Sequence, residues 1–177
     1  MALNVAMSVI VNQLALPIYL DTLGTILATV LAGPVAGVVT GVLSQAVIGL
    51  QVGAFMLAFA PLQALVALLA WAIARRAGFR APLSSAAWGV ASGLVAGLVS
   101  SVVSYAVFKG VTAAGVTGVT ALLRGAGLPL PLAVAGASTL TDMADKAVAF
   151  SVAGAALRAL PRRLLARAPL AQRAIGA

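Results

Sequence analysis

Long stretches without charged side chains are the feature that most constrains this sequence. Five apolar stretches contain no charge, and a sixth has three charges in its first half and one at its end; they cover residues 2–16, 22–32, 35–49, 56–74, 83–108 and 140–158. Only 8% of all residues are charged, whereas a soluble domain averages about 25%. The pattern predicts an all-α protein: a single integral membrane domain over residues 1–177, built as a bundle of six transmembrane helices.

Basic side chains are distributed unevenly among the connecting segments. A topology of six spans places two basic residues on one side of the membrane, Lys109 and Arg124. It places eight on the other side: Arg75, Arg76, Arg80, Arg158, Arg162, Arg163, Arg167 and Arg173. Cytoplasmic segments of membrane proteins carry the excess of lysine and arginine, so both termini are expected in the cytoplasm, with the basic tail 159–177 along the membrane surface. Topology thus accounts for the net charge of +8, and we expect no nucleic-acid partner.

Two segments leave alternatives open. The first stretch, residues 2–16, is short for a span and lacks a basic flank, so it either begins in protein-covered surroundings or follows residues absent from this sequence. The connection 109–137 is long and rich in glycine, threonine and proline. Loops of this length are usually functional or disordered, and its apolar content favours a function, such as that of a lid.

The charges in the sixth stretch are close together. Asp142, Asp145 and Lys146 follow Thr139, and the spacing of Thr139 and Asp142 is that of a capping box, which predicts a helix beginning at Leu140. The charges would then lie in the first two turns, near the outer face. One interpretation is a local i,i+4 pair of Asp142 and Lys146. The other is contact with a solute, because ionisable groups are costly inside a membrane.

Polar side chains of the other stretches are expected at the same depth as this cluster. Together they predict a substrate-binding pocket open to the outside, formed by Asn12, Asp21, Gln45, Gln63, Ser104, Tyr105, Asp142, Asp145 and Lys146. Lys146 would suit a carboxylate or phosphate, and the aspartates an amine or ring nitrogens. Aromatic residues make up only 5% of the chain, which favours a small polar metabolite over a large stacked ring system.

Cysteine and histidine are both absent from the sequence. Their absence excludes disulfides, thiol chemistry, histidine acid–base catalysis and the usual zinc ligands. No constellation of a nucleophile and a base is visible, so we expect neither an enzyme nor a metal site or cofactor in this chain.

Three segments together carry a resemblance to a known family. They are Pro-Ile-Tyr-Leu-Asp-Thr-Leu-Gly-Thr at residues 17–25, Leu-Ala-Gly-Pro-Val-Ala-Gly-Val-Val-Thr-Gly at 31–41, and Asp-Met-Ala-Asp-Lys at 142–146 ahead of a Leu-Pro-Arg-Arg tail. The chain resembles a substrate-binding S component of an energy-coupling factor (ECF) transporter. The resemblance implies a six-helix subunit of a prokaryotic cell membrane that captures a vitamin-like micronutrient from outside. Its partners would be a transmembrane coupling subunit and two ABC-type ATPase subunits, which would hydrolyse the ATP.

The same resemblance implies a docking surface for the coupling subunit. Such families dock through an Ala-x-x-x-Ala motif in the first helix, which Ala2 and Ala6 match. A stripe of small residues, Gly33, Gly37 and Gly41, offers a second docking face or serves internal packing. A stand-alone secondary transporter or channel for a small polar solute is the alternative function, because an intramembrane carboxylate can relay protons.

Overall fold

The computed structural model describes residues 1–112 and 114–176, and every regular element within these ranges is helical. The elements are α1 (Ala2–Gln13), α2 (Leu23–Ala32), α3 (Pro34–Val52), the 3-10 helix η1 (Ala54–Phe59), α4 (Ala60–Ala74), α5 (Pro82–Phe108), α6 (Ala114–Gly125), α7 (Leu130–Arg158), α8 (Arg162–Leu165) and α9 (Pro169–Ile175). The predicted all-α class is confirmed. Among the described residues, three segments are long and apolar enough to cross a membrane, namely Pro34–Gln51, Met56–Ala74 and Pro82–Phe108, which indicates a membrane protein.

Prolines and one glycine set several of these helix boundaries. Pro34 and Pro82 occupy the first turns of α3 and α5, where their missing N–H groups leave no hydrogen bond unmade and their fixed φ suits a helix. Gly33 joins α2 to α3 with a φ of 95°, a conformation that glycine adopts without strain. The chain therefore reverses direction there within a single residue.

Helix α7 differs from the sequence prediction. It begins at Leu130 and not at Leu140, and its 29 residues extend over roughly 43 Å at about 1.5 Å per residue. Pro131 lies in its first turn, so this proline, which falls within the connection predicted over residues 109–137, helps to start the helix. Thr139 and Asp142 consequently form no capping box. The charged cluster lies in the middle of a long helix, with three turns of helix ahead of it.

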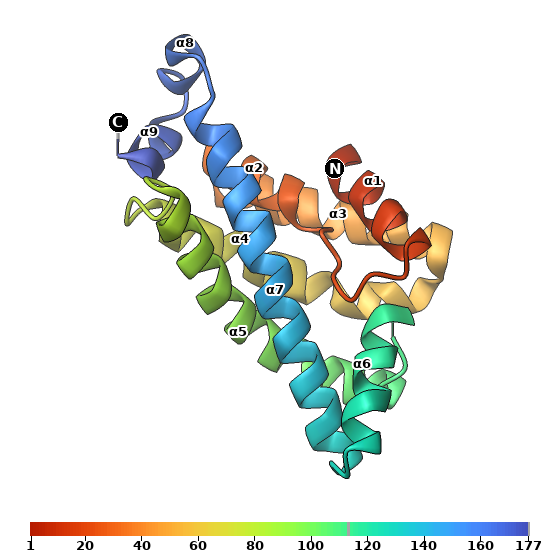
Figure 1. The fold of residues 1–177 in the computed structure, drawn as a ribbon. Coiled ribbons are helices and arrows are strands. Elements are labelled where there is room, and N and C mark those ends of the chain that lie inside the picture. The colour runs from red at the N-terminus through yellow and green to blue at the C-terminus, as the bar shows by residue number, and fades with distance from the viewer. Residues whose placement is uncertain (113, 177) are drawn as a thin grey trace.

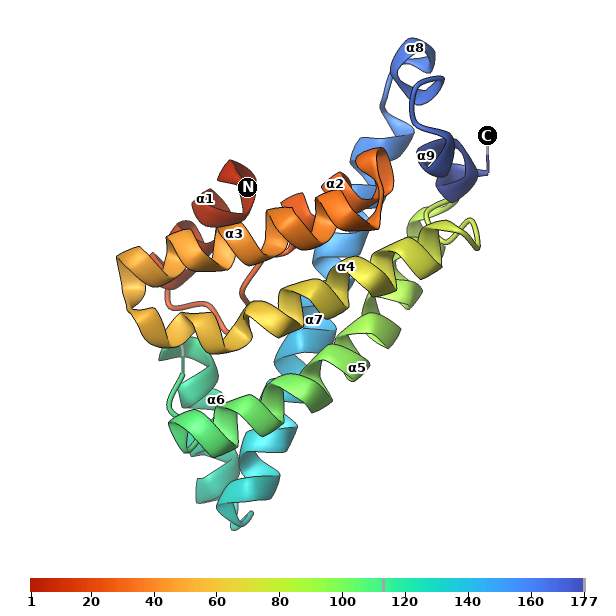
Figure 2. The ribbon, with the colours of Figure 1, turned by 180° about the vertical axis from the view of Figure 1, so that it is seen from behind.

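Helices α5 and α7 run side by side in opposite directions (Figures 1 and 2). Three glycines of α5, Gly89, Gly93 and Gly97, allow close contact between the two backbones. A methyl group at Gly93 would lie 2.4 Å from the carbonyl oxygen of Asp142, and one at Gly89 would lie 2.4 Å from that of Lys146. Small residues permit such close helix packing in membrane proteins. The stripe therefore holds the charged segment of α7 against α5.

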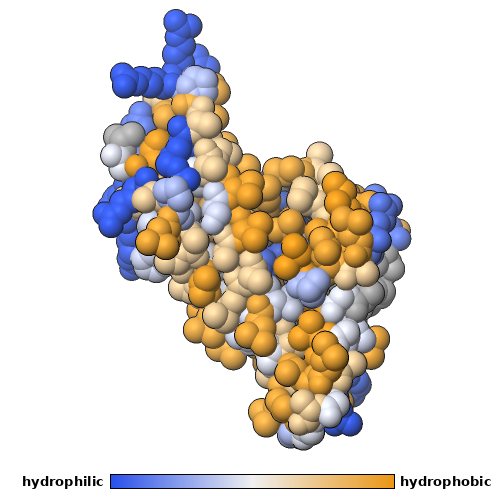
Figure 3. Space-filling view, viewed as in Figure 1, coloured by the Kyte–Doolittle hydropathy of each residue, from blue (hydrophilic) through white to orange (hydrophobic). Residues whose placement is uncertain are grey.

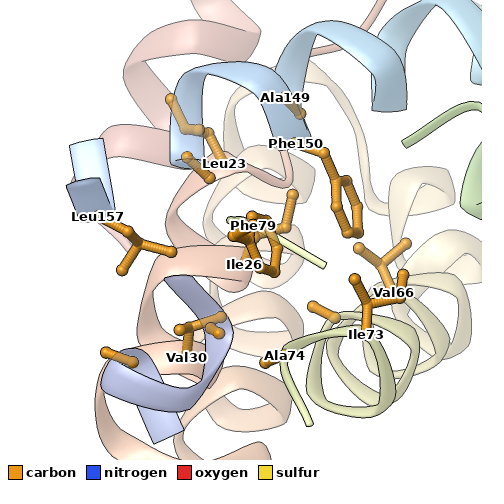
Figure 4. Packing of buried hydrophobic residues seen from close by; sticks show 14 of the residues in the cluster. Leu23, Ile26, Val30, Val66, Ile73, Ala74, Phe79, Ala149, Phe150 and Leu157 are labelled. Atoms are coloured by element: carbon orange, nitrogen blue, oxygen red, sulfur yellow. The ribbon is translucent and has the colours of Figure 1, made fainter. Parts of the chain in front are cut away.

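The hydrophobic core lies where α2, α4 and α7 meet α9 (Figure 4). Phe79, in the connection after α4, stacks on Phe150 of α7 with ring centroids 5.5 Å apart. The backbone N–H of Phe79 donates to the carbonyl of Ala174, and Arg158 Nη1 donates to the carbonyl of Phe79 at 2.8 Å. The basic loop 75–80 and the basic tail therefore lie at one end of the molecule, as the topology prediction requires.

Helices α4 and α5 lie close together at this end and diverge towards the other, where α6 lies (Figure 2), whereas α3 and η1 are joined there through Gly53. Figure 3 shows hydrophilic side chains gathered over α8 and α9, and a largely hydrophobic surface over much of the remaining face. Large apolar side chains point outward, among them Val35, Leu50, Leu83, Val102 and Leu122. A soluble monomer rarely exposes apolar surface on this scale, whereas lipid would cover it in a membrane.

Candidate solute-binding site

The charged residues of α7 form a compact buried cluster. The ammonium of Lys146 is ion-paired with Oδ2 of Asp145 and lies 3.4 Å from Oδ1 of Asp142. These three residues are at most 1% exposed. The only other acidic residue of the sequence, Asp21, comes from the connection between α1 and α2 and lines the same cavity as Asp142 and Lys146. All the negative side-chain charge of the protein is therefore concentrated in one place.

This cavity lies in the half of the bundle away from the basic loop and tail, and its empty space of about 490 Å³ includes volume open to the outside. Elements from across the chain contribute to it. Its polar lining consists of Tyr19, Asp21, Thr22, Gln45, Gln63, Ser100, Thr112, Asp142 and Lys146, and its apolar lining of Met56, Phe59 and Leu62. Phe59 is held in place by stacking on Phe108 of α5, with ring centroids 5.5 Å apart. The cavity thus combines charged, amide and aromatic surfaces, as small-molecule sites do.

Asp145 does not line the cavity but holds one of its walls. Its Oδ1 accepts hydrogen bonds from the backbone N–H groups of Tyr19 at 3.0 Å and Leu20 at 2.6 Å. Leu20 has a φ of 50°, in the left-handed region that costs a residue with a side chain about 1–2 kcal/mol. Two hydrogen bonds to a carboxylate offset that cost. Asp145 therefore positions the connection that brings Tyr19 and Asp21 to the cavity.

Asp21 is anchored from the other side by a chain of buried hydrogen bonds. Gln63 Nε2 donates to Asp21 Oδ2 at 3.0 Å, and Thr25 Oγ1 donates to Gln63 Oε1 at 3.0 Å. Asn4 Nδ2 in turn donates to Thr25 Oγ1 at 2.9 Å and to Ser44 Oγ at 3.1 Å. Sequence reasoning missed Asn4, which is fully buried; the signal was a carboxamide in the first turn of an otherwise apolar helix. The chain links α1 to the wall of the cavity through α2 and α4.

The structure brings together five of the nine predicted substrate-binding residues as cavity lining: Asp21, Gln45, Gln63, Asp142 and Lys146. Asn12 and Tyr105 lie outside it. Asn12 is exposed near the end of α1, and Tyr105 is 39% exposed with the Lys109 ammonium 5.4 Å from its ring centroid. Ser104 is buried but does not reach the cavity, and Asp145 lies behind it as described above.

Several lining residues were not on the predicted list. Ser100 is one of them: its hydroxyl donates to Asp142 Oδ2 at 2.6 Å and so orients that carboxylate. The others are Tyr19, Thr22, Met56, Phe59, Leu62 and Thr112. Ser100 follows Gly97 in the α5 series of small residues at spacings of three and four, and this shared helix face was the available signal. The residues of connections and of η1 had no comparable signal.

The small residues proposed for docking have different surroundings. Ala2 and Ala6 are exposed on α1, on the face opposite the buried Asn4. Gly37 and Gly41 are buried within the chain: a methyl group at Gly37 would lie 1.8 Å from Thr29 Oγ1, and one at Gly41 would lie 2.9 Å from Cβ of Gln63. Internal packing of α3 against α2 and α4 accounts for these two glycines, and Gly33 serves the turn between helices.

The environment of Asp21 changes its titration. Burial raises the pKa of the Asp21 carboxyl group to about 6, with smaller upward contributions from Asp145 and Asp142 and an opposing one from the ammonium of Lys146. Asp21 therefore carries its charge at neutral pH and loses it under mildly acidic conditions.

Within residues 1–112 and 114–176, no group of three or more metal-ligating side chains is placed to hold an ion. The cavity offers charged groups, hydrogen-bonding groups and apolar surface. Comparison of the chain with protein-family models, with curated proteins and with solved structures found no match in any of the three.

Proposed function

We propose that the protein is the solute-capturing subunit of an ECF-type transporter in a prokaryotic cell membrane. The observation that carries the proposal is a charged cavity inside an apolar helical protein, where every acidic side chain of the sequence gathers. Two of the three segments that resemble S components also supply cavity residues: Tyr19, Asp21 and Thr22 from residues 17–25, and Asp142 and Lys146 from residues 142–146. Charges kept inside a membrane domain generally serve a solute or ion.

In this function the chain performs binding and no chemical step. The cavity lies at the end of the bundle opposite the basic loop and tail, which would be cytoplasmic in the six-span topology, so a solute would arrive from outside. Import would require partners: a transmembrane coupling subunit that contacts the exposed Ala2 and Ala6 face of α1, and two ATPase subunits that hydrolyse ATP. Small side chains on that face would permit close helix contact.

Purification of the tagged protein from its native membrane tests this function. We expect an apolar coupling subunit and two ATP-hydrolysing subunits to co-purify, identified by mass spectrometry, and the assembly to hydrolyse ATP. A protein that purifies alone and equilibrates solutes across liposomes without ATP would contradict the proposal and favour the stand-alone transporter or channel.

A pair of bulky substitutions tests the docking surface within the same assembly. Ala6→Trp should prevent co-purification of the partners, because an indole blocks close approach of another helix. Ala91→Trp is the matched control, since Ala91 is also an exposed alanine, on α5. Retained partners in Ala6→Trp, or equal loss in both variants, would place docking elsewhere.

A further inference from the structure

We propose that the cavity selects a compact organic cation whose nitrogen atoms donate hydrogen bonds, an ammonium or amidinium group carried on a small apolar body. The inference rests on the proposed function only in taking the cavity as the site of solute capture. It assigns the charge and the hydrogen-bonding character of the solute, which the sequence left open between anions and cations.

The first argument is the charge balance. Three carboxylates and one ammonium surround the site, so the cluster is negative whenever its acids are ionised. The ammonium of Lys146 is already engaged by Asp145 and Asp142. An anionic solute would have to displace one of these carboxylates from the lysine and would then lie next to it, whereas a cation would meet net attraction.

The second argument is that the amide and serine donors of the lining are occupied. Gln63 Nε2 donates to Asp21, Ser100 Oγ donates to Asp142, and Gln45 Nε2 donates to the carbonyl of Met56 at 2.9 Å. These bonds satisfy the groups with each other, so none is directed at a guest. The hydroxyls of Thr22 and Thr112 lack a partner and can either donate or accept, so they do not favour an anion over a cation.

The third argument is that acceptors are left over. Asp142 Oδ1 is buried without a hydrogen-bond partner and has only the ionic contact with Lys146 at 3.4 Å. Thr22 Oγ1 is likewise buried without a partner, and Thr22 is 3% exposed. Both residues line the cavity. Buried polar atoms are normally paired, so unpaired acceptors facing a cavity indicate a guest that supplies N–H or O–H groups.

The apolar lining defines the rest of the solute. Met56, Phe59 and Leu62 form one wall, and the Phe59 ring is fixed by its stack on Phe108. A flat or short apolar body fits against this wall while its cationic end reaches Asp142. Cation attraction to the faces of aromatic rings adds to the same preference.

Three probes of nearly equal shape test the inference on the purified full chain in detergent: benzamidinium, benzamide and benzoate, at matched ionic strength. A ligand that binds only the folded state raises the unfolding temperature, and at equal concentration the ligand with the lower Kd raises it more. We expect benzamidinium to raise it clearly, benzamide weakly and benzoate not at all. Equal shifts, a larger shift with benzoate, or no shift with benzamidinium would overturn the proposal.

Matched variants locate the effect. Thr22→Val removes an unpaired hydroxyl of the cavity with little change of shape, and Ser92→Ala removes an unpaired buried hydroxyl that lies outside it. We expect Thr22→Val to fold normally and to weaken benzamidinium binding several-fold, and Ser92→Ala to leave it unchanged. Asp142→Asn should weaken it at least tenfold. Unchanged affinity in Thr22→Val and Asp142→Asn would place the probe outside this cavity and overturn the proposal.

The two proposals fail in distinguishable ways. Selective benzamidinium binding by a protein that purifies without ATPase subunits would contradict the transporter assignment and leave the cation assignment intact. A protein that co-purifies with ATPase subunits but is stabilised by benzoate would contradict the cation assignment and leave the transporter assignment intact.

Discussion

At the scale of single residues, Lys146 acts as a counter-ion to two acids. The sequence suggested a lysine that could bind an anionic solute, but the structure shows its ammonium held between Asp142 and Asp145. Replacing Lys146 would therefore test the stability of the cluster before it tested the binding of a solute.

The first prediction follows from this pairing. Lys146→Met leaves two buried carboxylates without a cation, and removing one partner of a buried pair typically costs about 3–5 kcal/mol. The double variant Asp145→Asn with Lys146→Met leaves only one such carboxylate and should regain part of the loss. Thermal unfolding in detergent measures both, and equal stability of wild type and Lys146→Met would show that the lysine is not structurally required.

A second prediction concerns pH. The pKa of Asp21 is about 6 in the folded protein against an ordinary value of 3.8, so the folded state binds this proton more tightly than the unfolded state. Asp21 should therefore make the unliganded protein more stable as pH falls from about 7 to about 4. Binding of benzamidinium should weaken as pH falls through the upper part of that interval, because protonation of Asp21 removes one negative charge from the cavity.

Asp21→Asn is the control for this pH dependence. It removes the titrating group while keeping an oxygen that can accept from Gln63, so both pH effects should be reduced. The charged neighbours that face Asp21 are Asp142, Asp145 and Lys146. A pH profile identical in wild type and Asp21→Asn would assign the effect to one of those groups.

At the scale of helices, the contact of α5 with α7 decides where the charges lie. Gly93→Ala places a methyl group 2.4 Å from the carbonyl of Asp142, which the two backbones can accommodate only by moving apart. We expect a loss of about 1–3 kcal/mol of stability, as for other overpacked sites, together with weaker solute binding. Thermal unfolding and benzamidinium titration of the same preparation measure the two effects.

Gly118→Ala is the matched control, because Gly118 lies in helix α6 and has no atom within 4 Å of an added methyl group. Alanine is the better helix former, so this variant should be as stable as the wild type or slightly more stable. Destabilisation of equal size in both variants would indicate a general intolerance of the bundle and not a contact between α5 and α7.

Helix boundaries could be predicted where a proline or glycine was compatible with only one role, either starting or ending a helix. Helices α2 and α5 begin and end within a residue of the predicted bounds, because Gly33 and Pro82 mark them clearly. The start of α7 was misplaced by ten residues, since a proline that ends a helix and one that opens a helix look alike in a sequence. The long connection 109–137 was consequently overestimated.

The site was only partly predictable for a different reason. Acidic residues are so rare here that Asp21 and Asp142 were found from their charge alone. Asn12 lies outside the cavity and Asn4 was overlooked, because α1 carries four polar residues, Asn4, Ser8, Asn12 and Gln13, and the sequence does not show which of them faces inward. Only the packing of α1 on α2 and α3 distinguishes the buried amide from the exposed one.

At the scale of the whole molecule, the distribution of basic residues predicts orientation, and the cysteine-free sequence makes it testable. A single cysteine in Ala166→Cys, beside α8, should react with a membrane-impermeant thiol reagent only from the cytoplasmic side. One in Gly125→Cys, at the end of α6, should react only from outside. Both positions are exposed. Labelling of both from the same side would contradict the six-span topology.

The concentration of all three acids at one internal site leaves the ten basic side chains other than Lys146 without any carboxylate side chain of their own protein to pair with. Outside the cavity the protein is thus a pure polycation, and its neutralising ions come from its surroundings. In a membrane these are the phosphates of anionic lipids or the acidic surface of another subunit. Ionic strength and lipid headgroup charge should consequently govern how the protein behaves once it is extracted.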